Sequence, residues 1–168
     1  MSDGKLRRFT EWSRGGASDV EGQLVRASER VRTSQTPYNS THMSVIGIGV
    51  DVIECSRIQR SLERFGDRFL HRVFTQGEIS YSMSMKFPER HLAARFAGKE
   101  AAAKAFGTGI GKAMGWRNID IQKKESGEPF LVLSGPAEAF AAERGVTSAL
   151  VTLSHTDHYA VACVVLEG

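Results

Sequence analysis

The sequence centres on one alanine-rich segment, Arg95-Phe96-Ala97-Gly98-Lys99-Glu100-Ala101-Ala102-Ala103-Lys104-Ala105-Phe106. A proline precedes it and two glycines follow it, as they follow a helix C-terminus, so we expect a helix over residues 89–106. At about 100° per residue, Arg95 and Lys99 stack one turn apart, and Glu100 and Lys104 form a neighbouring ridge. The helix therefore carries three cations around one carboxylate.

Two interpretations of this charge pattern are open. An exposed helix face with i,i+4 ion pairs is the simpler one, since each such pair contributes only a few tenths of a kcal/mol. Gly98 argues against it, because glycine costs a helix interior about 1 kcal/mol relative to alanine. The surrounding small residues would instead let another backbone or a ligand approach closely.

Strand patterns flank this helix on both sides. Residues 45–53 are dense in β-branched residues and predict a buried strand. Ile119 and Ile121 alternate with polar residues and predict a hairpin with residues 130–133, and residues 149–153 and 160–166 predict two further strands. Strands grouped as hairpins around helices indicate an α+β fold with a largely antiparallel sheet.

Two capping-box spacings mark helix starts. Ser56 with Gln59 predicts a helix over residues 57–65, and Thr75 with Glu78 repeats the signal. Pro136 predicts a short helix that ends before Gly145.

Length and charge limit the possible classes of protein. The chain has 168 residues, of which 41% are hydrophobic, enough for one core and too few for two ordinary enzymatic domains. Residues 1–42 carry seven basic and five acidic side chains, so two of the three net positive charges lie there. The nearly neutral remainder argues against nucleic acid as a partner. No apolar run reaches the roughly 18 residues that cross a bilayer, so we expect no membrane partner and a cytoplasmic protein.

The chain divides near Met43. Residues 1–42 show little apolar periodicity, and we expect a disordered extension, either native or left by cloning, with the domain at residues 43–168. Cys55 and Cys163 have no metal-binding spacing and are expected to be reduced, packed thiols, with a single disulfide as the alternative.

Asp51 is the one charge inside the first strand pattern. An unpaired buried carboxylate is costly, so Asp51 either caps a strand end or pairs with an arginine, or it binds a metal. Together with Glu100 it would suit magnesium, which takes one or two carboxylates and leaves its other positions to water and phosphate oxygens. Arg95, Lys99 and Lys104 would then hold phosphate charge.

Three segments, in order, resemble the signatures of the holo-acyl-carrier-protein synthases: Gly47-Ile48-Gly49-Val50-Asp51-Val52, residues 95–109, and Ser154-His155-Thr156. The resemblance extends over residues 43–168. Its departures are Val50 and Val52 in place of isoleucine or leucine, Gly98 where alanine is common, and the N-terminal extension.

The resemblance implies a 4′-phosphopantetheinyl transferase-like α+β fold. It also implies transfer of 4′-phosphopantetheine from coenzyme A to a serine of an acyl carrier protein, with release of adenosine 3′,5′-bisphosphate. Such phosphoryl transfer depends on positioning and on neutralising pyrophosphate charge. By the same resemblance, Asp51 and Glu100 bind magnesium, and the catalytic residues are Glu100, Lys104 and His155. The implied coenzyme A contacts are Arg95, Lys99, Lys104, Gly107 and His155.

The general base stays open between a metal-bound water, Glu100 and Glu78. Glu78 is the weaker of these because its capping-box position already gives it a structural role.

An acidic carrier protein needs a basic docking surface. Arg57, Arg60 and Arg64 recur at spacings of three and four, opposite an apolar stripe that includes Phe65. A solvated amphipathic face is the alternative. The resemblance further implies a homotrimer with active sites between subunits.

Other interpretations compete with this one. His155 and His158 invite a zinc site but lack a convincing third ligand. A magnesium-dependent phosphohydrolase would use water in place of the carrier serine. A nucleotide- or coenzyme A-binding module without turnover, or an RNA-binding domain using the arginine helix, would bind with a steep salt dependence.

Overall fold

A computed structural model describes residues 44–168, and the extension expected at residues 1–42 lies outside this range. The described chain begins with β1 (Val45–Glu54) and continues through three short helices, α3 (Cys55–Phe65), α4 (Asp67–Val73) and α5 (Gln76–Met83), to the long helix α6 (Pro88–Ala105). After it come η1 (Trp116–Asn118), β2 (Ile119–Lys123), β3 (Pro129–Leu133), α7 (Pro136–Glu143), β4 (Ser148–His155) and β5 (Tyr159–Glu167).

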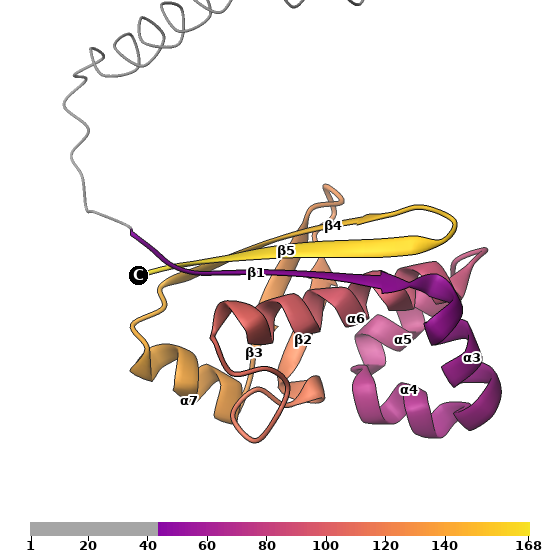
Figure 1. Cartoon of the computed structure of the whole chain (residues 1–168), viewed down its shortest axis with the longest axis horizontal. Helices are drawn as coiled ribbons and strands as arrows, with labels where there is room; N and C mark the ends of the chain where they lie inside the picture. Colours follow the sequence, from indigo (N-terminus) through magenta and orange to yellow (C-terminus); the bar gives the residue numbers. More distant parts are fainter. Residues whose placement is uncertain (1–43) are drawn as a thin grey trace, which may run out of the picture. The chain divides into compact units, whose positions relative to one another are not determined.

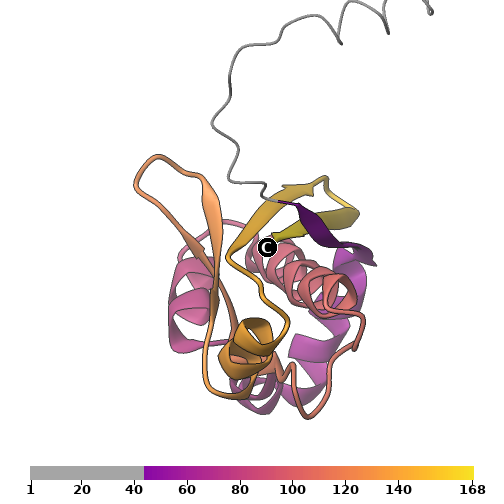
Figure 2. The same cartoon turned by 90° about the vertical axis from the view of Figure 1, so that its left-hand side faces the viewer.

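Helix α6 forms the centre of the domain. Pro88 occupies its first turn, where a missing backbone N–H costs nothing, and Gly107 follows its C-terminus with a positive φ of 71°. Figure 2 shows the helix end-on, enclosed by the three-stranded sheet, the β2–β3 hairpin and the preceding helices. Eleven of its 18 residues are buried, Arg95 and Lys99 among them. The exposed helix face with ion pairs is therefore the wrong interpretation.

The strands form two separate antiparallel sheets, which confirms the expected α+β class. β1, β5 and β4 make a three-stranded sheet with β5 in the middle, and β2 pairs only with β3 within the described residues. In Figure 1 the three-stranded sheet lies along one side of α6, and α7 lies at the opposite end of that helix from α3, α4 and α5.

The contact between β1 and α6 depends on two glycines. A Cβ atom on Gly49 would lie 2.0 Å from the carbonyl oxygen of Ala101, and one on Gly47 would lie 2.3 Å from that of Ala105. Only glycine lets the two backbones approach this closely. Gly98 serves a different contact, because its Cβ would meet side-chain carbons of Ile121 and Leu153 at 3.1–3.3 Å.

One capping prediction is confirmed and one is wrong. Thr75 and Glu78 form a complete capping box at the start of α5. Helix α3 begins earlier than expected, after Glu54, without a side-chain cap. The Ser56 hydroxyl instead bonds to Glu54, and Gln59 donates to Glu63. Helix α4 was not expected, because its seven residues are too few to show a clear period.

Cys55 is buried and Cys163 is partly buried, and neither forms a disulfide, as expected of reduced thiols. Within residues 44–168, every helix is too short or too polar to cross a membrane.

Candidate functional site

Asp51 and Lys104 form the first part of the site. Asp51 lies on the face of β1 that packs against α6, and its Oδ1 atom accepts a hydrogen bond from Lys104 Nζ at 2.7 Å. The Asp51 side chain is 15% exposed and that of Lys104 is 49% exposed. The strand carboxylate is therefore paired, but with a lysine of α6 rather than with an arginine, and the ammonium group still reaches solvent.

Glu100 lies one helical turn before Lys104 and beside the same carboxylate. Burial raises the pKa of Glu100, the neighbouring charge of Asp51 raises it further, and Lys104 opposes both effects. Two carboxylates close enough to repel each other form a place where a cation relieves the repulsion. Hard oxygen donors from two elements fit magnesium, whose other positions go to water and phosphate.

Among residues 44–168 no cluster of three or more His, Cys, Asp or Glu side chains could hold a metal ion. A metal ion at this position would therefore have only Asp51 and Glu100 of these residues as carboxylate donors. Two carboxylates are what magnesium takes when phosphate completes its coordination.

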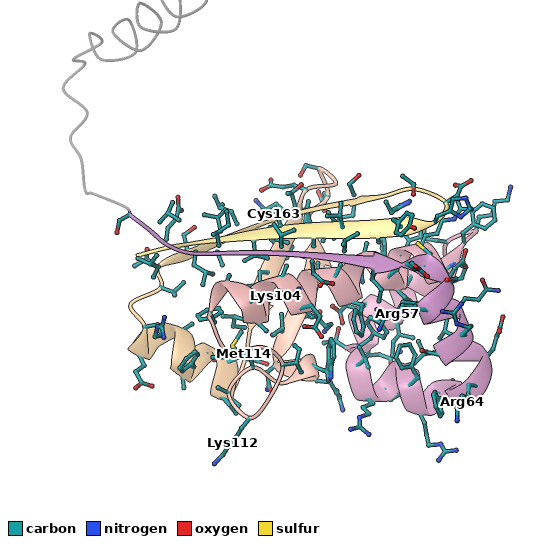
Figure 3. All side chains as sticks on the ribbon, viewed as in Figure 1. Arg57, Arg64, Lys104, Lys112, Met114 and Cys163 are labelled. Carbon is teal, nitrogen blue, oxygen red and sulfur yellow. The ribbon has the colours of Figure 1, made fainter. Side chains whose placement is uncertain are left out.

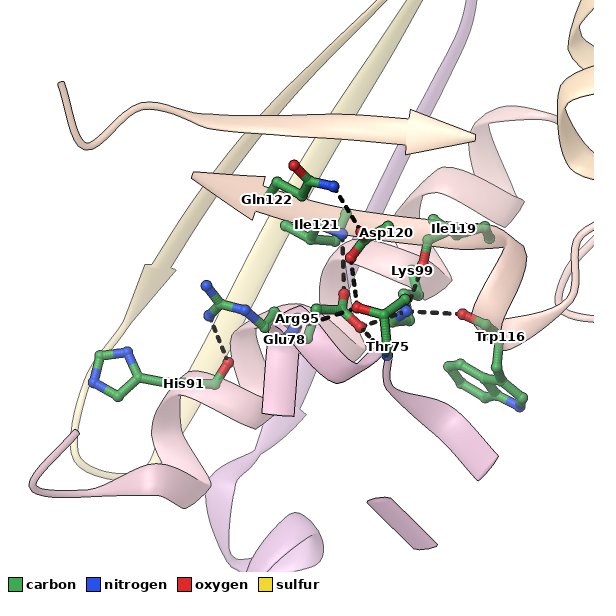
Figure 4. Close-up of polar contacts among 10 residues, drawn as sticks. All are labelled: Thr75, Glu78, His91, Arg95, Lys99, Trp116, Ile119, Asp120, Ile121 and Gln122. Carbon is green, nitrogen blue, oxygen red and sulfur yellow. Dashed lines mark hydrogen bonds and ion pairs between the residues drawn. The ribbon is translucent and has the colours of Figure 1, made fainter. Parts of the chain in front are cut away.

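The ammonium group of Lys99 makes its contacts inside the protein. Its ammonium group is fully buried, forms an ion pair with Glu78 Oε2 at 2.8 Å, and donates to the carbonyl oxygens of Trp116, at 2.8 Å, and Ile119. Figure 4 shows these contacts converging between α5, α6 and β2. All three ammonium protons have partners inside the chain, so Lys99 is not free to meet a nucleotide at the surface.

Both carboxylate oxygens of Glu78 are likewise occupied by contacts inside the protein. Its Oε1 atom accepts from the backbone N–H of Ile121 at 2.9 Å, and its Oε2 atom accepts from Thr75 N–H and Lys99. A carboxylate that is 2% exposed with both oxygens bonded cannot collect the proton of a carrier serine. Glu78 is therefore a structural residue, and the sequence could show its capping role but not its lysine partner.

A surface cavity of about 320 Å³ lies between α5, α6 and β2, and its lining includes the cations Arg95 and Lys123 as well as the carboxylates Glu78 and Asp120. Arg95 borders it, and its guanidinium lies 4.2 Å from the ring centroid of Tyr81. Lys123 lies on the same ring, with Nζ 3.4 Å from the Tyr81 hydroxyl. Tyr81 and Lys123 line this cavity, and the sequence interpretation did not include them because neither belongs to a recognisable motif.

His155 is linked to this cavity through His91. It occupies the last position of β4 and is exposed, and its ring packs edge-to-face on that of His91, with centroids 5.1 Å apart. His91 in turn packs on Tyr81. The structure thus brings Arg95 and His155 into one neighbourhood.

The carboxylates of Asp51 and Glu100 lie apart from Arg95 and His155 in the fold. Asp51 lies on β1 and His155 on β4, which are the two opposite edges of the three-stranded sheet. On α6, Arg95 precedes Glu100 by five residues, which is about 140° around the helix axis. Within one chain, the structure therefore does not join the expected metal ligands to Arg95 and His155.

The basic residues of α3 are exposed, as expected, at positions 57, 60 and 64. Figure 3 shows Arg57 and Arg64 on this side of the domain, away from Lys112. Phe65 departs from the predicted apolar stripe, because it is 47% exposed. With Arg68, Phe69 and Arg72 it lines a surface cavity of about 370 Å³ between α3 and α4.

Known proteins are similar to this chain in sequence and in fold. The family described as the 4′-phosphopantetheinyl transferase superfamily matches residues 47–164. Holo-acyl-carrier-protein synthases from Koribacter versatilis and Chlamydia trachomatis are 43% and 44% identical over 123 residues, covering 73% of this chain and 98% and 100% of theirs.

Solved structures agree with the sequence comparison. A holo-acyl-carrier-protein synthase from Neisseria meningitidis superposes with a TM-score of 0.70 at 34% identity, covering 74% of this chain and all of the other. The enzyme from Bacillus anthracis, solved in complex with coenzyme A (3′,5′-ADP), gives a TM-score of 0.63 at 35% identity, covering 75% of this chain and 98% of the other. By its sequence and its fold, the chain belongs to the 4′-phosphopantetheinyl transferase superfamily.

Proposed function

We propose that this transferase moves 4′-phosphopantetheine from coenzyme A to a serine of an apo acyl carrier protein, with magnesium bound, and releases adenosine 3′,5′-bisphosphate. The observation that carries the proposal is the carboxylate pair Asp51 and Glu100, set beside Lys104, whose side chain is half exposed. Relatives with coenzyme A bound support the donor substrate.

Asp51 and Glu100 would hold the metal ion. When bound, magnesium supplies a positive centre that neutralises pyrophosphate oxygens and orients the phosphorus for attack. Lys104 donates to Asp51 Oδ1 at 2.7 Å and to the carbonyl oxygen of Val50 at 3.3 Å, which leaves its third proton for a phosphate oxygen to accept. This chain contributes mainly charge placement, which is the main demand of phosphoryl transfer.

Arg95 and His155 would bind the nucleotide part of coenzyme A. Arg95 has a cation–π contact with Tyr81 and one hydrogen bond, to the carbonyl oxygen of His91, while its Nε is buried without a partner. A buried, partly unsatisfied guanidinium beside a cavity is suited to a phosphate group. Gly107, with a φ of 71°, turns the chain after α6, and its backbone N–H donates to the carbonyl oxygen of Lys104 at 2.9 Å. Lys99 is left out of this contact set because its protons are occupied.

A complete site would need two copies of the chain. The outer face of the three-stranded sheet exposes large apolar residues, among them Ile48 (66%), Val52 (61%), Val50 (54%) and Leu150 (54%). Apolar patches of this kind mark association surfaces. We propose that this face joins copies into a homotrimer in which Asp51 and Glu100 of one copy meet Arg95 and His155 of the next.

The carrier protein would dock on α3 and α4. Arg57, Arg60 and Arg64 present positive charge, and the cavity lined by Phe65, Arg68, Phe69 and Arg72 adds an apolar floor with two more cations. An acidic partner with an apolar side chain at its contact suits this surface.

Intact-mass measurement tests the function. We expect an apo acyl carrier protein, incubated with this protein, coenzyme A and magnesium, to gain one phosphopantetheine group. A parallel reaction without carrier protein separates transfer from hydrolysis. Rapid release of adenosine bisphosphate in that reaction, together with no gain of carrier mass in the complete reaction, would contradict the proposal. Binding of coenzyme A with neither product would identify a module without turnover.

A further inference from the structure

Three aromatic rings from three elements form a continuous stack at the edge of the cavity near Arg95. Tyr81 of α5 and His91 of α6 are edge-to-face, with centroids 5.9 Å apart and an interplanar angle of 84°. His91 and His155 of β4 are also edge-to-face, at 5.1 Å and 76°. His91 is therefore the middle member of the stack, and the proposed function has so far given it no role.

We propose that His91 is a positioning residue that fixes the orientation of the His155 imidazole for coenzyme A; this inference rests on the proposed function. Among residues 44–168 the His155 ring has no hydrogen bond or ion pair, and it is exposed at the end of an edge strand. Its edge-to-face contact with His91 is the interaction that restrains it. Aromatic pairs in this range of distances and angles attract each other beyond their buried area.

His91 is itself well anchored. Tyr81 packs on its ring, and its carbonyl oxygen accepts a hydrogen bond from Arg95 Nη1 at 3.1 Å. The Arg95 guanidinium lies over the ring of Tyr81 at 4.2 Å, which closes a triangle of contacts. His91 thus connects the two expected coenzyme A contacts, because its backbone holds Arg95 and its ring holds His155.

The His91 ring acts here as an uncharged surface. Burial lowers the pKa of His91, and the nearby charges of His155 of β4, Arg95 of its own helix and Lys123 of β2 lower it further. Glu89 of α6 opposes them, and Tyr81 of α5 faces the ring. A neutral imidazole can lie beside His155 without repelling it when His155 binds an anion. Phenylalanine should therefore replace His91 without loss, and alanine should not.

The experiment compares His91→Phe, His91→Ala, His155→Ala and the double variant H91A/H155A, with His158→Ala as a matched histidine control. Titration calorimetry measures the dissociation constant for coenzyme A, and the mass assay gives kcat and KM. We expect H91A to raise the dissociation constant and KM about three- to tenfold with little change in kcat, whereas H91F stays near wild type. The double variant should bind no more weakly than H155A, because His91 acts through His155.

Full additivity of H91A and H155A, or equal loss in H91F and H91A, would overturn the inference. Failure of the proposed function is separable: wild-type protein that binds coenzyme A tightly but transfers nothing refutes the reaction, while the binding cycle still tests His91. Wild-type protein that does not bind coenzyme A overturns both. Imidazole NMR signals give a further readout, since H91A should broaden or shift the His155 ring resonances and H91F should restore them.

Discussion

Lys104 Nζ lies 2.7 Å from Asp51 Oδ1, so one cation of α6 is held by the carboxylate of β1 that is expected to bind magnesium. Glu100 lies one helical turn before Lys104, and the charge of Asp51 raises its pKa while that of Lys104 lowers it. The charges of these three side chains are therefore coupled, so substituting any one of them alters the electrostatic environment of the other two.

Removal of either carboxylate should abolish transfer. We expect Asp51→Ala and Glu100→Ala to lower kcat/KM by more than about 100-fold, the upper end of the loss caused by mutating an outer partner of a metal site. Glu143→Gln, at an exposed position of α7, is the matched control and should keep full activity. Magnesium titrations of each variant provide the measurement, and normal activity in both alanine variants would remove the proposed metal site.

Glu100→Gln should unfold less readily than wild type at neutral pH. The folded-state pKa of Glu100 is raised above its ordinary value of 4.5, so the folded protein holds this proton more tightly than the unfolded chain does. The stabilising effect of that proton is complete below the unfolded pKa and is lost as the pH rises through the folded pKa. The advantage of Glu100→Gln should therefore be present at pH 7, shrink as the pH falls through the raised folded-state pKa, and be gone below the ordinary value of 4.5.

Urea denaturation across pH, without magnesium, measures this difference. Added magnesium should raise the wild-type midpoint and leave Glu100→Gln nearly unchanged, because a ligand stabilises the form that binds it. A variant less stable than wild type at pH 7 would show that Glu100 is not under electrostatic strain.

Complementary variants should restore activity if the site is shared between subunits. We would co-express Glu100→Ala and His155→Ala with different tags and purify the mixed assemblies. If the two variants mix at random, about a quarter of the shared sites would receive an intact Glu100 from one copy and an intact His155 from the next. We expect each variant alone to be nearly inactive and the mixed assembly to recover a corresponding fraction of wild-type turnover. Recovery no greater than the sum of the two pure variants would place the whole site within one chain.

Local signals made part of this fold predictable. Helix α6 was predictable because alanine content, the preceding proline and the following glycine all act within the helix. Thr75 and Glu78 were predictable as a cap for the same reason. The burial of Lys99 was not predictable, because an alanine-rich helix that is enclosed on all sides has no polar face to show which side meets solvent. Its partner Glu78 is brought to it only by tertiary packing.

The site was predictable only in part, for similar reasons. The motifs indicated Asp51, Glu100 and Lys104, and the structure brings them together. Tyr81 and His91 could not be found from sequence, because an aromatic stack between α5, α6 and β4 depends on three elements meeting. Phe65 followed the helical period, yet no element between residues 44 and 168 covers that position.

The two classes of glycine should respond differently to alanine. Gly49→Ala would place a Cβ 2.0 Å from Ala101 O and 2.6 Å from Ala105 N, and because backbone atoms cannot move cheaply, we expect a loss of roughly 3 kcal/mol or more in unfolding free energy. Gly98→Ala would meet only side-chain carbons at 3.1 Å or more and gains helix propensity, so it should stay within about 1 kcal/mol of wild type. Chemical denaturation of both variants checks the contrast, which equal losses would contradict.

The Glu78–Lys99 pair should be far more sensitive to loss of one partner than any surface pair. Lys99→Met leaves a buried carboxylate without its cation, and we expect a loss of about 3–5 kcal/mol in unfolding free energy. Lys124→Met is the matched control, since Lys124 pairs with Glu128 at 3.0 Å with both side chains more than half exposed, and it should cost at most about 0.5 kcal/mol. The double variant E78Q/K99M should recover part of the loss, because it no longer buries an unpaired charge. If Lys99→Met were as mild as Lys124→Met, Lys99 would have to leave its enclosure in solution, and a direct contact with the nucleotide would again be open to it.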